Sequence, residues 1–154
     1  MTREESVDYI FKSVWHAIYR MYNQHANKHG FTTTVGFVLL NIHYEKGTPA
    51  TKIAPKLGLE PRSLTRILKS MEEEGLIHKK KDSEDKRTVN IYLTEEGRRK
   101  RELAKVGVMG FNQSVRKLIS DDELENLQRV AGKVFEVVRN LDLSEETTLD
   151  SLED

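Results

Sequence analysis

Cationic side chains at helical spacing are the first residues in this sequence whose chemistry suggests a ligand. Arg62, Arg66 and Lys69 recur four and three residues apart, so they would share one face of a helix that starts at Pro61. An arginine on such a face can hold a guanine through two hydrogen bonds, and a lysine can pair with a phosphate. Hydroxyl groups between the cations can bind either kind of base pair. The candidate nucleic-acid contacts on this helix are Arg62, Ser63, Thr65, Arg66 and Lys69.

A second group of cations surrounds a short charged turn that follows this helix. Residues 76–81 and 88–93 are expected to form two antiparallel strands, because apolar and polar residues alternate in the second of them. A basic hairpin beside a groove-binding helix can reach the DNA backbone or the minor groove, and Arg87 is the best candidate for insertion there. The candidate contacts of the hairpin are Lys79, Lys81, Lys86 and Arg87.

The two aspartates of this turn have a different expected role. Asp82 and Asp85 are not expected to touch DNA, but to shape the turn by accepting backbone hydrogen bonds or to hold Arg87 in place. Both groups of cations also have a plainer interpretation. Charged helix faces are common at protein surfaces, and lysines protect an exposed strand edge. The order of helix and basic hairpin favours the interpretation as a DNA-binding surface.

The distribution of charge supports this interpretation, although the chain has a net charge of zero. Residues 50–101 contain 14 lysines and arginines against 9 aspartates and glutamates, whereas residues 121–154 contain 3 against 11. The middle of the chain is therefore basic and its C-terminal end is acidic. The local electric field, rather than the net charge, steers a polyanion to a protein surface.

Helices account for most of the remaining sequence, because apolar residues recur at helical intervals. The expected helices span about residues 2–29, 33–46, 48–57, 61–74, 95–119 and 121–141. Thr48 and Pro49 would begin the third of these, and Pro55 inside it is expected to delay its start or to bend it. The expected fold class is mainly α with a small two-stranded β wing, as a winged helix-turn-helix flanked by long helices.

The flanking helices carry broad apolar stripes that a small winged domain could not cover. In the last helix the stripe consists of Leu124, Leu127, Val130, Ala131, Val134, Val137, Val138 and Leu141. Exposed stripes of this length call for a partner surface. The sequence by itself therefore indicates that the chain associates with another copy or another protein.

Several short motifs are distributed over this arrangement. They are Ile53-Ala54, Leu57-Gly58-Leu59, Ser63-Leu64-Thr65-Arg66, Glu74-Gly75-Leu76-Ile77, Asp82-x-x-Asp85-x-Arg87 and Leu93-Thr94-x-x-Gly97. Together they resemble the MarR family of bacterial transcription regulators over about residues 5 to 140, and the wing motif beside the helix motif is the most specific part. The chain departs from the family pattern at Glu84, where many members have arginine, and at Pro55, which replaces an ordinary helix former.

This resemblance implies a homodimer that binds a near-palindromic operator in double-stranded DNA, most often as a repressor. It implies a single MarR-like domain over residues 1–154, in which residues 33–94 form the DNA-binding winged helix-turn-helix. Residues 1–30 and 95–142 would be the dimerisation helices. Residues 143–154 form an acidic tail that is expected to fray.

The resemblance also implies a possible effector. Family members commonly release DNA when a small anion, often aromatic or phenolic, binds between the dimer helices and the winged part. The residues that could line such a pocket are Trp15, Tyr19, Tyr22, Phe37 and Phe111. Aromatic residues at helical spacing are also the usual material of a hydrophobic core, and this alternative applies to each of them.

Other classes of function find less support in the sequence. The absence of cysteine excludes disulfides, thiol catalysis and cysteine zinc sites. His25 and His29 have the spacing of a metal-binding pair, but no neighbouring ligand supports them, so we expect neither a metal nor another cofactor. The sequence contains no nucleophile–base pattern, phosphate-binding glycine loop or HExxH motif that would indicate an enzyme.

One alternative remains open, a helical module whose winged part binds protein or RNA in place of an operator. Tyr92 is the only aromatic residue of the wing, whereas single-stranded RNA is usually bound on aromatic side chains. No apolar run is long enough to span a membrane, and the first residues are acidic where a signal peptide is basic. We therefore expect a cytoplasmic protein that binds duplex DNA.

Overall fold

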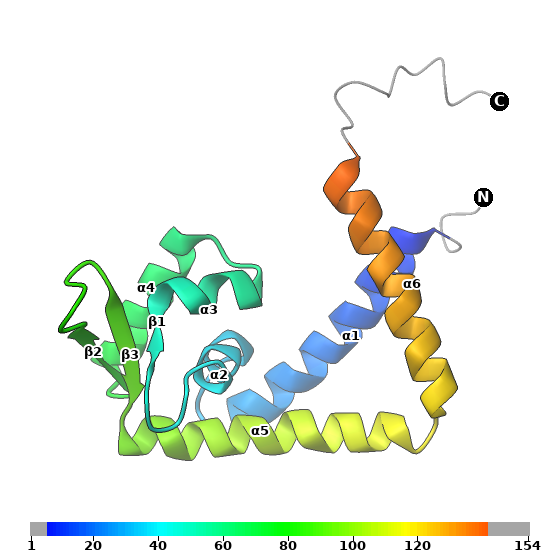
Figure 1. Cartoon of the computed structure of the whole chain (residues 1–154). Coiled ribbons are helices and arrows are strands. Elements are labelled where there is room, and N and C mark those ends of the chain that lie inside the picture. Colours follow the sequence, from blue (N-terminus) through cyan, green and yellow to red (C-terminus); the bar gives the residue numbers. More distant parts are fainter. Residues whose placement is uncertain (1–5, 142–154) are drawn as a thin grey trace. The chain divides into compact units, whose positions relative to one another are not determined.

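The computed structural model of the chain describes residues 6–141, which fall into two units, 6–111 and 112–141 (Figure 1). The elements are α1 (Val7–Lys28), α2 (Thr33–Leu40), β1 (Thr48–Pro49), α3 (Ala50–Leu57), α4 (Pro61–Glu73), β2 (Ile77–Lys81), β3 (Val89–Leu93), α5 (Glu95–Arg116) and α6 (Asp121–Asn140). The end of α5 and all of α6 belong to the second unit. The expected fold class, mainly helical with a small β wing, is confirmed, and the sheet has one strand more than the sequence indicated.

The first helix and the turn after it follow the sequence pattern. α1 begins at Val7, so the earlier part of the expected helix lies outside the described residues. After α1, Gly30 adopts a φ of 70°, a left-handed conformation that glycine reaches without steric cost. The side chain of Thr32 then accepts a hydrogen bond from the backbone N–H of Val35 (3.2 Å), which caps the start of α2.

The apolar composition predicted that α2 would continue to Lys46, but the helix ends at Leu40. Polar side chains compete for the backbone at this point. The side-chain amide of Asn41 donates to the carbonyl of Phe37 (2.9 Å), and Nδ1 of His43 accepts from the backbone N–H of Lys46 (3.1 Å). These local hydrogen bonds close a turn where a further helical turn would otherwise form.

Thr48 and Pro49 form strand β1, which corrects the expectation that they begin a helix. β1 pairs antiparallel with β3, and Thr48 lies opposite Ile91 while Pro49 lies opposite Asn90. Proline has no backbone N–H to donate, and it is tolerated on the edge strand of a sheet. A Thr-Pro pair therefore suits this edge as well as it suits a helix start, and α3 begins afterwards at Ala50.

Pro55 lies inside α3, which starts at Ala50 and runs to Leu57. The start is one residue later than the Thr-Pro pair suggested, in line with the expected delay. Ile53 and Ala54 are buried, whereas Pro55 is exposed, so the proline ring lies on the solvent side of the helix. The helix keeps its buried face although Pro55 has no N–H to donate.

The winged part, from α2 to β3, encloses one hydrophobic core. α4 contributes Leu64, Leu68 and Met71, and β3, the central strand of the order β1-β3-β2, contributes Ile91 and Leu93. The antiparallel pairing of β2 with β3 extends over the full length of both strands. The core holds the outer face of α4 and the turn of the wing in fixed positions.

α5 lies close to α1 at several points between Leu103 and Phe111. Nε2 of His25 lies 2.8 Å from the carbonyl oxygen of Leu103. A Cβ atom on Gly107 would lie 2.7 Å from the His25 ring, whereas a Cβ atom on Gly110 would meet open space. The absence of a side chain at Gly107 therefore permits the close approach of α5 to α1.

α6, in the second unit, begins with a capping box. The hydroxyl of Ser120 accepts from the backbone N–H of Glu123 (3.2 Å), and the carboxylate of Glu123 accepts from the backbone N–H of Ser120 (2.7 Å). None of the residues of α6 is buried. The acidic tail expected at residues 143–154 lies outside the described residues. Within residues 6–141, no helix has the length and apolar character that crossing a membrane requires.

Candidate nucleic-acid interface

The cationic helix expected from the sequence is α4, with Pro61 at its first position. Because Leu64 and Met71 face the core of the winged part, the opposite face of α4 is turned outward. The exposed residues on this face include Arg62, Thr65, Arg66 and Lys69. Ser63 is half-buried beside them. The structure therefore brings all five candidate residues of the helix onto or beside one solvent-facing surface.

Two of these side chains have partners within α4. The hydroxyl of Thr65 donates to the carbonyl of Pro61 (2.9 Å), which leaves its oxygen available as an acceptor. Nζ of Lys69 lies 3.9 Å from Glu73, and an exposed pair of this kind contributes little stability. The exposed arginines of the face, Arg62 and Arg66, form no ion pair within residues 6–141.

Asp82 organises the turn of the wing. Its Oδ1 accepts from the backbone N–H groups of Glu84 (2.9 Å) and Asp85 (3.1 Å), and its Oδ2 accepts from the side-chain amide of Asn90 (3.0 Å). The backbone N–H groups of Asp85 and Glu84, followed by the Asn90 amide, hold the pKa of Asp82 below its ordinary value. This carboxylate therefore stabilises the turn in its ionised form.

Asp85 closes the same turn from the other side. Its Oδ1 accepts from the backbone N–H of Arg87 (3.0 Å), and its Oδ2 accepts from the hydroxyl of Thr88 (3.0 Å). Within the described part of the chain, no ion pair joins Asp85 to the guanidinium of Arg87. The geometry matches the backbone role considered for the aspartates, and the side chain of Arg87 is exposed. Glu84 is exposed beside it and adds a negative charge to the turn.

Lys79 differs from the other cations of the wing. Its Nζ lies 2.9 Å from a carboxylate oxygen of Glu72 on α4, and only 29% of its side chain is exposed. The hydrogen bond from Lys79 is the largest cause that lowers the pKa of Glu72. Lys79 therefore attaches the wing to α4. The exposed cations of the wing that form no ion pair among residues 6–141 include Lys81, Lys86 and Arg87.

The alternation of side chains along β2 explains this difference and could have revealed it in advance. Successive residues of a strand face opposite sides of the sheet, so Lys79 shares a side with buried Ile77, while Lys80 lies on the other side. There Nζ of Lys80 lies 5.5 Å from the ring centre of Tyr92, on which the ring of His78 stacks at 5.4 Å.

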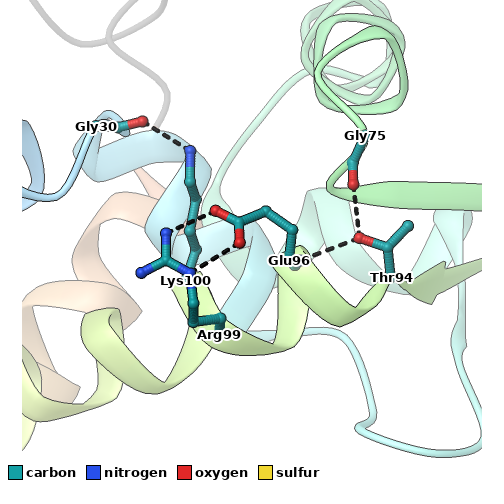
Figure 2. Close-up of polar contacts among 7 residues, drawn as sticks. Gly30, Gly75, Thr94, Glu96, Arg99 and Lys100 are labelled. Carbon is teal, nitrogen blue, oxygen red and sulfur yellow. Dashed lines mark hydrogen bonds and ion pairs between the residues drawn. The ribbon is translucent and has the colours of Figure 1, made fainter.

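A junction at the C-terminal end of α4 was not recognised as such from the sequence (Figure 2). The hydroxyl of Thr94 donates to the carbonyl of Gly75 (2.6 Å) and accepts from the backbone N–H of Gly97 (3.0 Å). The sequence placed Thr94 directly before the helix expected at residues 95–119. The contact with Gly75 joins residues 19 positions apart, and a single sequence contains no periodic signal for it.

The five aromatic residues predicted for a ligand pocket are connected by ring contacts. The ring of Trp15 lies 5.9 Å from that of Tyr19 and 6.3 Å from that of Phe37, and Tyr22 lies 5.6 Å from Phe37 and 5.8 Å from Phe111. Burial raises the pKa of the Tyr22 hydroxyl. The five rings form one connected set, although half of Trp15 is exposed and the other four are only half-buried.

A small apolar pocket lies beside these rings. Its volume of about 20 Å³ is on the order of what one water molecule needs. Tyr22 and Phe37 line it together with His25, Phe31 and other residues of α1, α2 and α5, whereas Trp15, Tyr19 and Phe111 do not. A ligand of phenolic size would therefore have to separate some of the packed rings.

The two histidines with metal-binding spacing have ring centres 4.8 Å apart. Nε2 of His25 is already hydrogen-bonded to the carbonyl of Leu103. Residues 6–141 contain no group of three or more histidine, aspartate or glutamate side chains placed to hold a metal ion.

Comparison with known proteins shows two related regulators. The sequence model of the MarR family matches residues 31–89, from the turn after α1 to the start of β3. The uncharacterised HTH-type transcriptional regulator YhbI of Bacillus subtilis is 30% identical over 97 residues, which span 63% of this chain and only 63% of that relative. The HTH-type transcriptional regulator SarZ of Staphylococcus aureus is 26% identical over 121 residues, which span 77% of this chain and 82% of SarZ.

A solved structure has the same fold. The complex of Staphylococcus aureus MepR with DNA matches this chain with a TM-score of 0.78 and 22% sequence identity, over 86% of this chain and 98% of MepR. At this level of identity the likeness concerns the fold, a winged helix with long helices on both sides. The MarR family model thus matches the winged part of the chain, the chain is similar to two HTH-type transcriptional regulators, and it shares the fold of MepR.

Proposed function

We propose that this chain is a homodimeric regulator that binds a specific site in double-stranded DNA. In this proposal α4 enters the major groove, and the wing reaches the adjacent backbone or minor groove. The observation that carries the proposal is the exposed cationic face of α4 beside a wing with exposed and unpaired cations. The similar MepR protein has been solved on DNA, and its fold presents a helix and a wing in the same way.

The side chains of this surface have distinct proposed roles. Arg62 and Arg66 contact base edges, where a guanidinium prefers guanine, and Ser63 and Thr65 add hydroxyl contacts. Lys69 binds a phosphate, whose charge can replace its weak pairing with Glu73. In the wing, the residues proposed to bind phosphates are Lys81, Lys86 and Arg87. Lys79 is withdrawn from the set, because its charge is paired with Glu72.

The proposed partner in the dimer is a second copy of this chain. The exposed apolar residues of the flanking helices include Val7, Ile10, Phe11, Val14, Trp15, Met21, Val106, Met109, Leu127, Val130, Phe135, Val137 and Val138. So much exposed apolar surface on three helices is unusual for a monomer and typical of an interface. A two-fold symmetric dimer would read a near-palindromic site whose half-sites are about one DNA turn, roughly 34–36 Å, apart.

We also propose that the regulator acts in the cytoplasm as a repressor that a small aromatic anion releases from DNA. The small apolar pocket that Tyr22 and Phe37 line supports this proposal, in which the ligand binds by separating the two rings. Trp15 is the only tryptophan of the chain and stacks on Phe37, so its fluorescence is a direct probe of the ring set. A titration with phenolic acids should change this fluorescence and weaken DNA binding at the same concentrations.

The experiment that tests the proposed function is a selection of bound duplexes from random DNA by the purified full chain. We expect enrichment of a near-palindromic sequence, and much weaker binding to the same sequence as single-stranded DNA or as RNA. Equal binding to the RNA form would instead support the alternative of an RNA-binding module. Failure to enrich any duplex would contradict the proposal.

A further inference from the structure

Thr94 connects the end of α4 to the start of α5 through three hydrogen bonds, and Figure 2 shows the two that its hydroxyl forms. Its hydroxyl donates to the carbonyl of Gly75 (2.6 Å) and accepts from the backbone N–H of Gly97 (3.0 Å). Its backbone N–H donates to the carbonyl of Leu76 (3.1 Å). The same residue therefore caps α5 and holds two carbonyl groups that directly follow α4.

These carbonyl groups are fixed to α4. Gly75 has a φ of 71°, and the chain turns back so that the backbone N–H of Leu76 donates to the carbonyl of Met71 (2.9 Å). On the opposite side, a Cβ atom at Gly97 would lie only 1.9 Å from the carbonyl oxygen of Leu76. The first turn of α5 thus touches the backbone that follows α4, and the junction leaves little room for a different angle.

α5 is held to α1 farther along its length. Nζ of Lys100 donates to the carbonyl of Gly30 (2.9 Å), at the end of α1 (Figure 2), and the carbonyl of Leu103 lies 2.8 Å from Nε2 of His25. α1 carries part of the exposed apolar surface that we assign to the dimer. The junction at Thr94 therefore sets the orientation of α4 relative to α5. α5 in turn contacts α1, which carries part of the proposed dimer surface.

We propose that Thr94 is a positioning residue that sets the angle of α4 relative to α5, and thereby the spacing of half-sites that the dimer accepts. The proposal rests on the proposed function as a dimeric DNA-binding protein. α4 has 13 residues and is therefore roughly 20 Å long. A rotation of about 5° at its C-terminal end would move its N-terminal end by roughly 1.7 Å. Two symmetric movements amount to about 3.4 Å, the rise of one base pair.

Three substitutions separate the two functions of the hydroxyl. Thr94→Ser keeps both hydrogen bonds, and Thr94→Val removes both with little change of shape. Thr94→Asp keeps an acceptor for the N–H of Gly97, and aspartate is a good N-cap, but it cannot donate to Gly75 when ionised. Thr94→Asp therefore keeps the cap of α5 and removes only the hydrogen bond to Gly75. It still tests the proposal if Thr94→Val fails to fold.

The readout is the affinity of each full-length variant for operators whose half-sites are moved closer or farther apart by one base pair. We expect wild type and Thr94→Ser to prefer one spacing equally, within about twofold. In Thr94→Val and Thr94→Asp, the ratio of the affinities for the preferred and the shifted spacing should fall roughly tenfold. This is the size of effect expected from the loss of one hydrogen bond to a carbonyl. Their base preference within each half-site should stay unchanged, because Arg62 and its neighbours are unaltered.

A folded, dimeric Thr94→Asp chain with the spacing preference of wild type would overturn the proposal. So would a wild-type chain that binds its half-sites at every spacing equally well. These outcomes differ from failure of the proposed function, in which the wild-type chain would bind no specific duplex at all.

Discussion

The winged part and α6 differ in how their apolar side chains are covered. In the winged part, Leu39, Ile53, Met71, Leu76 and Ile91 are at most 1% exposed. In α6 no residue is buried, and Phe135 and Val138 are 68% and 71% exposed. α4 of the winged part and α6 are both amphipathic helices, so amphipathicity alone does not explain the difference.

The difference lies in what each apolar face meets. Within the winged part, α2, α3, α4 and the sheet cover one another, so this region completes its core within one chain. The stripe of α6 finds no such cover in its unit. A full burial of one valine or leucine is worth about 1.5–3 kcal/mol, so an uncovered stripe is a strong reason to associate. The winged part presents the cations, and in the proposed dimer the flanking helices would determine where the second set of cations lies.

Val130→Glu is expected to have the largest effect of the changes that test this comparison. Val130 belongs to the stripe of α6 and is 45% exposed in the single chain. In a symmetric dimer the change removes two apolar contacts worth about 1.5–3 kcal/mol each, so the dimer dissociation constant should rise roughly 10²- to 10⁴-fold. Sedimentation equilibrium should show monomers, and operator affinity should fall with dimerisation.

Gly132→Glu is the matched control, because Gly132 is exposed between the charged residues Arg129 and Glu136 on α6, and a Cβ atom there meets open space. It introduces the same charge into the same helix and should leave the dimer intact. Equal dimerisation of the two variants would show that the stripe of α6 does not form the interface.

Arg62→Ala tests the helix face of the winged part and should have the next largest effect. If Arg62 binds a base through two hydrogen bonds, its loss should remove about 1–3 kcal/mol of discrimination at one position of each half-site. Lys69→Ala should instead weaken binding to all sequences alike, because a phosphate contact carries no sequence information. A selection from random DNA with each variant distinguishes the two roles, and an unchanged sequence preference of Arg62→Ala would exclude base contact.

The sequence predicted the elements of the winged part better than their contacts. The apolar residues of α4 recur at helical spacing and those of β3 alternate, so the periodicity identified both the elements and their buried faces. The same reasoning placed the cations of α4 outside. It failed at Thr48 and Pro49, where one dipeptide suits either a helix start or an edge strand, and only the pairing with β3 decides between them.

Partners far apart in the chain could not be predicted from one sequence. The pair of Lys79 with Glu72 and the hydrogen bond of Thr94 to Gly75 depend on how elements pack, and periodicity describes only the elements themselves. The aromatic residues show the same limit. The sequence offered Tyr22 and Phe37 as pocket or core residues, but it could not show that their rings would pack edge to face, 5.6 Å apart.

Arg87→Ala compares a free cation of the wing with a paired one. Removal of one phosphate contact should lower the slope of log affinity against log salt concentration by roughly one unit and weaken binding moderately. Lys79→Ala should change this slope less, because the charge of Lys79 is already paired with Glu72. Titrations at several salt concentrations would measure both slopes. Equal losses of slope would mean that Lys79 leaves Glu72 and binds DNA.

Asp82→Asn is expected to have the smallest effect, and it concerns the stability of the wing turn at different pH values. Backbone N–H groups of Asp85 and Glu84 hold the pKa of Asp82 below its ordinary value of 3.8. A carboxyl group with a lowered pKa in the folded state stabilises that state above its unfolded pKa, and this contribution disappears as the pH falls through the folded pKa. The substitution should therefore lower the unfolding temperature slightly at neutral pH, and the difference from wild type should vanish in strong acid.

Glu84→Gln removes a carboxylate from the same turn and serves as the control, since the described residues donate no hydrogen bond to its side chain. It should leave the unfolding temperature at neutral pH nearly unchanged and strengthen DNA binding, because in the proposed complex it removes a negative charge near the phosphates. Lower stability of Asp82→Asn would show that hydrogen bonds within one chain hold the turn. Stronger DNA binding of Glu84→Gln would show that the outer charges of the turn act on DNA. If both substitutions changed stability equally at every pH, the hydrogen bonds of Asp82 would not be what holds the turn.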